Sequence, residues 1–154
     1  FAAISGLSID KSRESLAAFW ALYKGLDKYM KECEVRAVEE NEVHSFSGRT
    51  WRLDYDPSDQ QSIGRVQRIG RNFPIQATGS DMMKRAMYFM REETRGRDIG
   101  LVNAVHDEAV TEVSDELLEE AREIVSNSMI RAGEEILTRV PAKVDVNISK
   151  VWAK

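Results

Sequence analysis

Ile99-Gly-Leu-Val-Asn-Ala-Val-His-Asp-Glu-Ala-Val-Thr-Glu-Val113 is the stretch that decides the fold class of this chain. Two β-prone runs, Ile99 to Val105 and Glu108 to Val113, flank His106-Asp107. If Val105 pairs with Glu108, those two residues form the whole turn of an antiparallel hairpin. We therefore expect a small antiparallel sheet here.

Most of the remaining sequence has helical periodicity. Apolar residues recur at three- and four-residue spacing between Ser12 and Glu42, with Ser12 as the expected N-cap and Gly25 as the point that splits this stretch into two helices. Gln60 to Arg95 is helical again, but Pro74 lacks an N–H, so we expect a kink or a fresh start there. Ser114 is expected to cap a further amphipathic helix.

Two other regions predict strands. Val43 to Phe46 and Arg49 to Leu53 flank the Gly-containing turn Ser47-Gly48, which is typical of a second hairpin. Lys143 to Ile148 alternates between apolar and polar residues and predicts a final strand. The predicted fold class is α+β, a small antiparallel sheet with helices packed on one face.

Length and composition restrict the class of protein. A chain of 154 residues suggests one domain. The longest apolar run, Leu16 to Tyr23, has eight residues, whereas a membrane span needs about 20, so we expect no membrane partner. A single Cys33 excludes an internal disulfide and suits a reducing compartment, which predicts a cytoplasmic protein. Since the chain starts at Phe1 without a signal-peptide pattern, we expect a processed chain or a piece of a longer one.

The charge is unevenly distributed along the chain. The net charge is −4, yet residues 43–97 carry 10 Lys/Arg against 6 Asp/Glu. A basic middle inside an acidic chain predicts a strip that faces phosphates. Patchy surface charge without a partner is the alternative.

The predicted turn His106-Asp107 is chemically unusual. Two-residue hairpin turns prefer Asn-Gly or Asp-Gly, so an ionisable His106-Asp107-Glu108 triplet breaks a local rule and indicates a functional site. An ordinary acidic turn is the alternative. Carboxylates at such a tip suit Mg²⁺, which is usually held by one or two carboxylates together with substrate phosphates.

Two-metal phosphoryl transfer needs a second carboxylate element facing the first. No convincing second acidic strand motif is present, since Asp54 and Asp56 fall in a loop beside Pro57 and Asp145 falls on the predicted terminal strand. A small Mg²⁺-dependent hydrolase built on the tip alone is one further reading.

A polar series spaced four apart, Arg68, Asn72 and Gln76, predicts one helix face that binds DNA. Arg, Asn and Gln offer donors to the acceptors that the minor groove presents at every base pair, so the face would sense a duplex without reading its sequence. Arg65 and Arg71 nearby are expected to bind phosphates. A merely polar, solvated helix face is the alternative.

Four segments, taken in order, resemble segments of family A (DNA polymerase I-like) polymerases. The longest is Arg68-Ile-Gly-Arg-Asn-Phe-Pro-Ile-Gln-Ala-Thr-Gly-Ser-Asp-Met-Met-Lys-Arg-Ala-Met87. About 30 positions on, Val105-His106-Asp107-Glu108 is similar to that family's third catalytic motif. Ser47-Gly48-Arg49 and the closing segment from Val140-Pro141 to Trp152 are similar in order and spacing.

The resemblance implies an enzyme, a DNA-directed DNA polymerase, and the C-terminal part of its right-hand fold. Residues 1–42 would be a helical fingers-side segment and residues 43–154 the C-terminal half of the palm. The metal ligands would be Asp107 and Glu108, and His106 would contact the primer terminus. The DNA-binding residues would be Arg68, Asn72, Gln76, Arg65, Arg71 and Arg49. The implied cofactor is Mg²⁺.

The implied partners are primer–template DNA, a deoxynucleoside triphosphate (dNTP) and an upstream polymerase region or complementary chain. That region would supply the first catalytic Asp and the dNTP-binding helix, which match no position in these residues. Two further departures from the family pattern are Ala77, where Gly is usual, and Ala104, where Gln is frequent. The setting would be bacterial or viral replication. A non-catalytic DNA-binding module derived from a polymerase is the alternative function.

Overall fold

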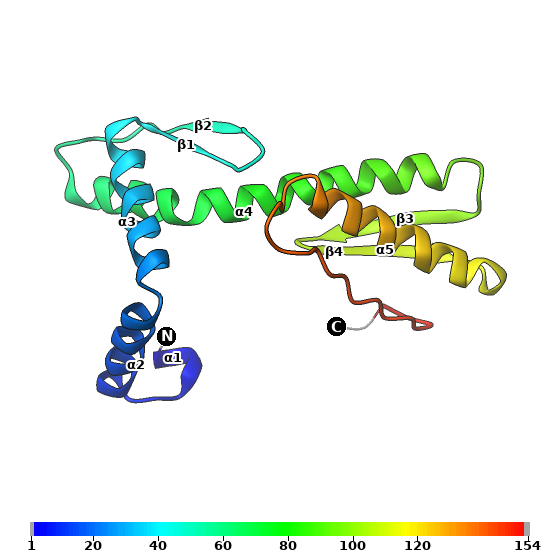
Figure 1. Ribbon diagram of the computed structural model, residues 1–154, viewed down its shortest axis with the longest axis horizontal. Helices are drawn as coiled ribbons and strands as arrows, with labels where there is room; N and C mark the ends of the chain where they lie inside the picture. Colours follow the sequence, from blue (N-terminus) through cyan, green and yellow to red (C-terminus); the bar gives the residue numbers. More distant parts are fainter. Residues whose placement is uncertain (1, 153–154) are drawn as a thin grey trace. The chain divides into compact units, whose positions relative to one another are not determined.

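The computed structural model describes residues 2–152, which form two compact units where the length alone suggests one domain. The first unit contains the residues up to His44 together with Thr50–Pro74. The second contains Ser45–Arg49 and the residues from Ile75 onward. A long helix, α4 (Gln60–Glu93), contributes its N-terminal part to the first unit and its C-terminal part to the second (Figure 1).

Three helices open the first unit: α1 (Ala2–Ser5), α2 (Ile9–Leu22) and α3 (Lys24–Glu39). The expected start at Ser12 is wrong, because Ser8 is the N-cap of α2 and its hydroxyl accepts a 3.4 Å hydrogen bond from the Lys11 N–H. Ser12 is instead buried inside α2. The expected break at Gly25 lies at Tyr23, whose φ of −103° and ψ of 54° depart from helical values.

The first hairpin pairs β1 (Glu42–His44) with β2 (Thr50–Arg52). Its strands are shorter than predicted, because the loop between them takes five residues, Ser45–Arg49. Gly48 in that loop has a φ of +89°, a conformation that glycine adopts at little cost. The predicted hairpin is confirmed.

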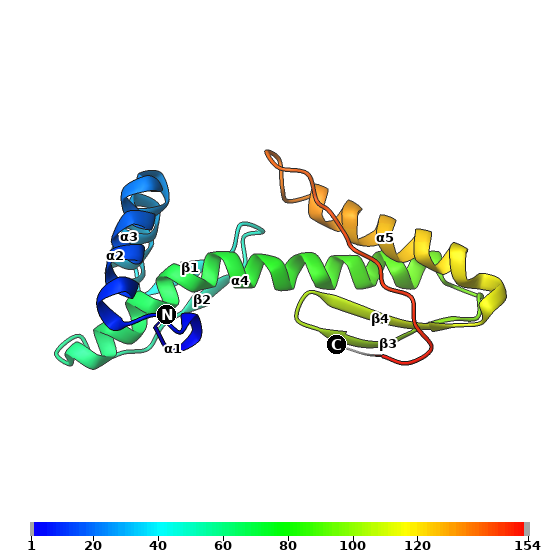
Figure 2. The same cartoon turned by 90° about the horizontal axis from the view of Figure 1, so that it is seen from below.

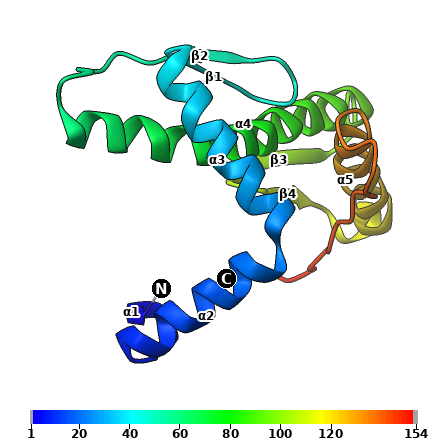
Figure 3. The ribbon, with the colours of Figure 1, turned by 60° about the vertical axis from the view of Figure 1, so that its left-hand side comes forward.

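The core of the first unit joins α3, the hairpin and α4. Ala37, Val43, Leu53 and Val66 are buried together, and Val66 has no exposed surface. Burying a valine of that kind contributes about 1.5–3 kcal/mol. Figure 3 shows α3 crossing α4 in this unit. The crossing is close at Gly70, where a Cβ would lie 2.6 Å from the carbonyl oxygen of Cys33.

The fresh start expected at Pro74 does not occur, since Pro74 lies inside α4, a single helix of 34 residues. Proline removes one backbone hydrogen bond and costs a helix interior about 3 kcal/mol. Buried side chains on both sides of Pro74, such as Val66 and Met90, offset that cost. Among the described residues, no helix is both long and apolar enough to cross a membrane, α4 included.

The second unit contains the hairpin of β3 (Ile99–Val105) and β4 (Glu108–Val113), a 3-10 turn η1 (Asp115–Leu117) and α5 (Leu118–Glu134). Its core includes Ala86, Phe89 and Met90 of α4 and Val125 and Ala132 of α5, with Ala109 and Met129 packed against them. Figure 2 shows α5 and the hairpin beside the C-terminal part of α4. Met83 and Met90 of α4 are buried, and Met82 and Met87 are half-buried. Ser114 caps η1 rather than α5, and its side chain makes no capping hydrogen bond.

The strands form two separate two-stranded sheets instead of one. The strand predicted over Lys143 to Ile148 does not form, because in the described chain no strand edge pairs with this segment. Two of its three apolar members are correspondingly open to solvent, Val146 by 41% and Ile148 by 48%. The α+β class with antiparallel pairing is nevertheless as predicted.

Candidate active site

The second hairpin places His106, Asp107 and Glu108 at one tip. Val105 pairs with Glu108, so His106 and Asp107 form the whole turn, as predicted. His106 has a φ of 55°, which non-glycine residues rarely adopt, whereas Asp107 keeps a negative φ. The turn therefore carries positive φ only at its first residue, as in type II′ turns, in which glycine is usual at that place. A strained residue other than glycine at the tip fits a functional constraint.

The three side chains at the tip differ in their surroundings. His106 and Asp107 are exposed, and Glu108 is half-buried. The indole Nε1 of Trp152 donates a 2.8 Å hydrogen bond to Glu108 Oε1. No residue that the structure describes donates a hydrogen bond to Asp107 or forms an ion pair with it. Two carboxylates, one of them open to solvent, fit one side of a Mg²⁺ site whose other ligands come from phosphates or from further chain.

The other acidic residues do not complete that site. Asp56 is occupied by its own loop, because Oδ1 accepts from the backbone N–H of Ser58 at 2.8 Å and from its hydroxyl at 2.7 Å. These hydrogen bonds hold the pKa of Asp56 below its usual value. Asp54 and Asp145 are exposed, the latter on a segment that forms no strand. In the first unit, Glu40, Glu42 and His44 have ligand atoms within 4.8 Å of one another, a group the sequence analysis did not single out.

Two members of the predicted DNA-binding series lie on the first-unit part of α4. Arg68 and Asn72 are both exposed, whereas Val66 and Gly70, two residues before each, are buried. The Asn72 amide nitrogen donates to the Arg68 carbonyl oxygen at 2.9 Å, which leaves the Asn72 amide oxygen and one N–H facing outward. Gln76, the next member of the series, is exposed on the second-unit part of the same helix.

The flanking arginines of α4 already have partners within the first unit. Arg65 Nη2 donates to the Asp54 carbonyl oxygen at 2.7 Å, and no carboxylate among residues 2–152 forms an ion pair with Arg65. Arg71 Nε lies 2.9 Å from Glu34 Oε1, so its charge is paired, although 42% of its side chain is exposed. Their phosphate-binding role stays a prediction.

Arg49 belongs to a cluster of Ser45, Ser47, Arg49 and Asp81 in the second unit, here called the Asp81 cluster. Asp81 Oδ2 accepts from Ser45 Oγ at 2.9 Å and from Ser47 Oγ, and Oδ1 lies 3.0 Å from Arg49 Nε. Burial raises the pKa of Asp81, but the hydrogen bonds from the two serines and the charge of Arg49 outweigh it, and the pKa lies below its usual value. The carboxylate thus stays ionised and ties the hairpin loop to α4.

Two backbone contacts strengthen this attachment. The Phe46 N–H donates to Thr78 Oγ1 at 2.9 Å, and Arg49 Nη2 donates to the Ala77 carbonyl oxygen at 3.0 Å. Arg49 belongs to the predicted DNA-binding set, whereas Asp81, which fixes its guanidinium, is not among the predicted site residues. The available signal was the pair of serines in the loop, Ser45 and Ser47, because a hydroxyl group can donate a hydrogen bond to a carboxylate. The DNA contact of Arg49 itself stays a prediction.

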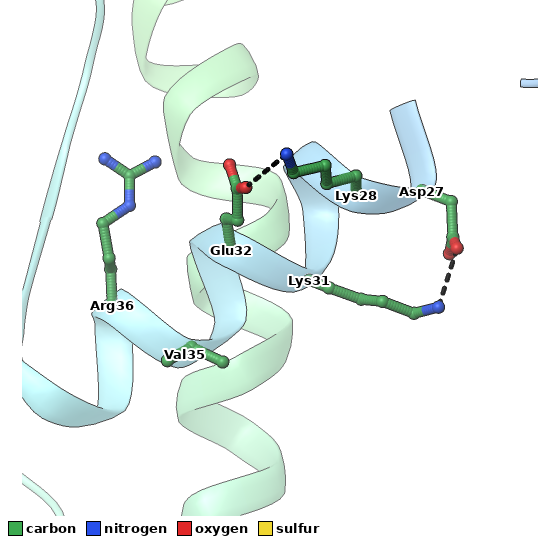
Figure 4. A pocket seen from close by; sticks show the side chains of 6 residues that line it. All are labelled: Asp27, Lys28, Lys31, Glu32, Val35 and Arg36. Carbon is green, nitrogen blue, oxygen red and sulfur yellow. Dashed lines mark hydrogen bonds and ion pairs between the residues drawn. The ribbon is translucent and has the colours of Figure 1, made fainter. Parts of the chain in front are cut away.

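A shallow groove lies along α3 in the first unit (Figure 4). It is lined by Asp27, Lys28, Lys31, Glu32, Val35 and Arg36. Its charges are largely paired along the helix, with Lys31 2.7 Å from Asp27 and Lys28 3.8 Å from Glu32. None of the predicted site residues lines this groove.

The chain is similar in sequence to known DNA polymerases. The profile of DNA polymerase family A matches residues 1–154. A DNA polymerase I of Aquifex aeolicus is 44% identical over 165 residues, covering 97% of this chain and 28% of that protein. DNA polymerase theta of Caenorhabditis elegans is 25% identical over 150 residues, covering 97% of this chain and 9% of that protein. The chain therefore spans less than a third of the length of these relatives.

One solved structure, the POL domain of Pol1 from M. smegmatis in complex with DNA primer-template and dNTP, has a similar fold. The TM-score is 0.76 at 24% sequence identity, over 85% of this chain and 24% of that chain. The likeness confirms the predicted fold class.

Proposed function

Because this chain belongs to DNA polymerase family A, we propose that it carries part of the active site for template-directed DNA synthesis. The observation that carries the proposal is the hairpin tip, where the family's third catalytic motif becomes a strained two-residue turn with an exposed Asp107. Residues 1–42 are the proposed fingers-side segment and residues 43–154 the C-terminal half of the palm. The predicted cytoplasmic setting belongs to the same proposal.

The proposed reaction is nucleotidyl transfer by a two-Mg²⁺ mechanism. The primer 3′-oxygen attacks the α-phosphorus of a dNTP, a new phosphorus–oxygen bond forms, the bond to the bridging oxygen breaks and pyrophosphate leaves, while the hydroxyl proton passes to water. Bound metal would lower the energy of the charge that develops on the attacking and leaving oxygens. In this chain Asp107 would hold it, Glu108 would support it, and His106 would contact the primer terminus. The other carboxylate and the dNTP site would come from an upstream region or a complementary chain.

The partners follow from the polar and basic residues of α4 and the first hairpin. Arg68 and Asn72 present exposed donors, and minor-groove acceptors occur at every base pair, so this helix would follow primer–template DNA without reading its sequence. Gln76 would extend the same series. The phosphate contacts are assigned to Arg65, Arg71 and Arg49, of which Arg65 has no ion-pair partner in the described part of the chain.

A complementation assay tests this proposal. The chain is mixed with the upstream region of a family A polymerase, a labelled primer–template, dNTPs and Mg²⁺. Primer extension is expected in the mixture and not with either polypeptide alone, and chelation of the metal is expected to stop it. Binding of primer–template without extension in the mixture would contradict the proposal and favour a non-catalytic DNA-binding module.

A further inference from the structure

The segment from Lys150 to Trp152, here called the C-terminal segment, is attached to the second hairpin at the carboxylate of Glu108, next to the tip. The indole N–H of Trp152 donates to Glu108 Oε1 at 2.8 Å, across 44 positions of sequence. Glu108 is the first residue of β4 and pairs with Val105 across the turn, so its backbone is fixed. The strand pairing does not fix its side chain, and the hydrogen bond from Trp152 restricts the rotation of that side chain.

A second attachment holds the same segment beyond the other end of β4. Lys150 Nζ lies 2.7 Å and 2.8 Å from the two carboxylate oxygens of Asp115, the first residue of η1. Lys150, two residues before Trp152, is therefore engaged with Asp115. The C-terminal segment therefore has two contacts, that of Lys150 with Asp115 and that of Trp152 with Glu108. The first contact helps to fix where the Trp152 indole lies relative to Glu108.

The hydrogen-bond donor to Glu108, the indole of Trp152, carries no charge. An indole N–H is a neutral donor, so it fixes one carboxylate oxygen without cancelling the charge of Glu108. An arginine or lysine at this place would compensate the charge, as Arg49 does for Asp81. The Glu108 carboxyl group is therefore oriented by a donor that carries no charge, and only one of its two oxygens is occupied by Trp152.

We propose that Trp152 is a positioning residue for nucleotidyl transfer, because its indole N–H fixes the carboxylate of Glu108 beside Asp107. The proposal rests on the proposed function of the tip. Loss of the indole N–H leaves Glu108 charged but mobile, so the rate of the chemical step should fall while the affinity for DNA and dNTP stays nearly unchanged.

The experiment compares Trp152→Phe with Trp51→Phe in the complemented polymerase. Trp51 is a matched control, since 47% of its surface is exposed against 52% for Trp152 and it keeps an aromatic contact with Phe73. Single-turnover primer extension is expected to slow about tenfold with Trp152→Phe, the scale of one hydrogen bond to a charged group. The apparent Kd values for dNTP and primer–template should change less than about twofold, and Trp51→Phe should leave all three values unchanged.

Glu108→Ala provides the test of mechanism. In that background Trp152→Phe should have no further effect, because the group that it positions is absent. A tenfold further loss, or equal rates for Trp152→Phe and Trp51→Phe, would overturn the proposal.

A readout without catalysis separates this proposal from the proposed function. With ¹⁵N-indole labelling, the signal of the Trp152 ring N–H should shift in Glu108→Ala while that of Trp51 stays in place. An inactive wild-type mixture would refute the proposed function, whereas an unmoved Trp152 signal would refute the positioning contact whatever the activity.

Discussion

Replacing Gly70 with alanine would force α3 and α4 apart within the first unit. The new Cβ would lie 2.6 Å from the Cys33 carbonyl oxygen and 2.7 Å from the Ala37 Cβ. Carbon atoms pack best at about 3.5–4.0 Å, so the two helices would have to separate by about 1 Å. Both obstacles are backbone or Cβ atoms, and rotation of a side chain cannot relieve them.

The expected change in the free energy of unfolding is the sum of two opposing contributions. Overpacking of this kind costs about 1–3 kcal/mol. Alanine is a better helix former than glycine by about 1 kcal/mol. We therefore expect Gly70→Ala to lower the free energy of unfolding by up to about 2 kcal/mol, although a Gly-to-Ala change in an open helix position should raise it.

Two glycines of the same helix supply matched controls. At Gly64 a Cβ would meet only Arg68 Nη1, at 3.6 Å, and at Gly79 it would meet nothing within 4 Å. Urea unfolding followed by circular dichroism should show Gly64→Ala and Gly79→Ala to be more stable than wild type by up to about 1 kcal/mol. If Gly70→Ala is as stable as these controls, the close crossing of α3 and α4 is wrong.

Three further predictions concern the candidate site. The pKa of Asp81 is lowered in the folded chain, so its ionised form adds stability that is fully present above about pH 3.9 and is lost as the pH falls through the folded pKa. Between pH 6 and pH 3, the urea midpoint of unfolding should therefore fall more steeply for wild type than for Asp81→Asn. Parallel curves for the two proteins would contradict this prediction. Arg68→Ala should weaken primer–template binding by a similar factor for every sequence, and a strongly sequence-dependent loss in a titration would instead indicate base readout. His106→Gly should raise the free energy of unfolding by about 1 kcal/mol, because glycine adopts the positive φ of this position without strain. Primer extension should fall in the same variant. A lower melting temperature than wild type would contradict strain at the tip.

Local rules predicted the hairpin tip correctly. The β-prone runs on either side of His106-Asp107 left two residues for the turn, and the absence of glycine there indicated a constraint beyond folding. The positive φ of His106 agrees with that reading.

Features set by distant residues were not predictable. The penalty at Pro74 is local, whereas the packing that offsets it comes from α3 and α5. The alternation over Lys143 to Ile148 predicts a strand, but a strand forms only where a partner edge offers hydrogen bonds. Asp81 is 32 positions from Arg49, and no sequence spacing links them.

The central claim is that Asp107 is a metal ligand of the polymerase, and Asp107→Asn in the complemented enzyme tests it most directly. The amide keeps the size of the side chain and removes its charge, so primer–template binding should be unchanged within about twofold while Mg²⁺-dependent extension is abolished. Extension within about tenfold of wild type, a cost of only about 1.4 kcal/mol, would contradict the claim.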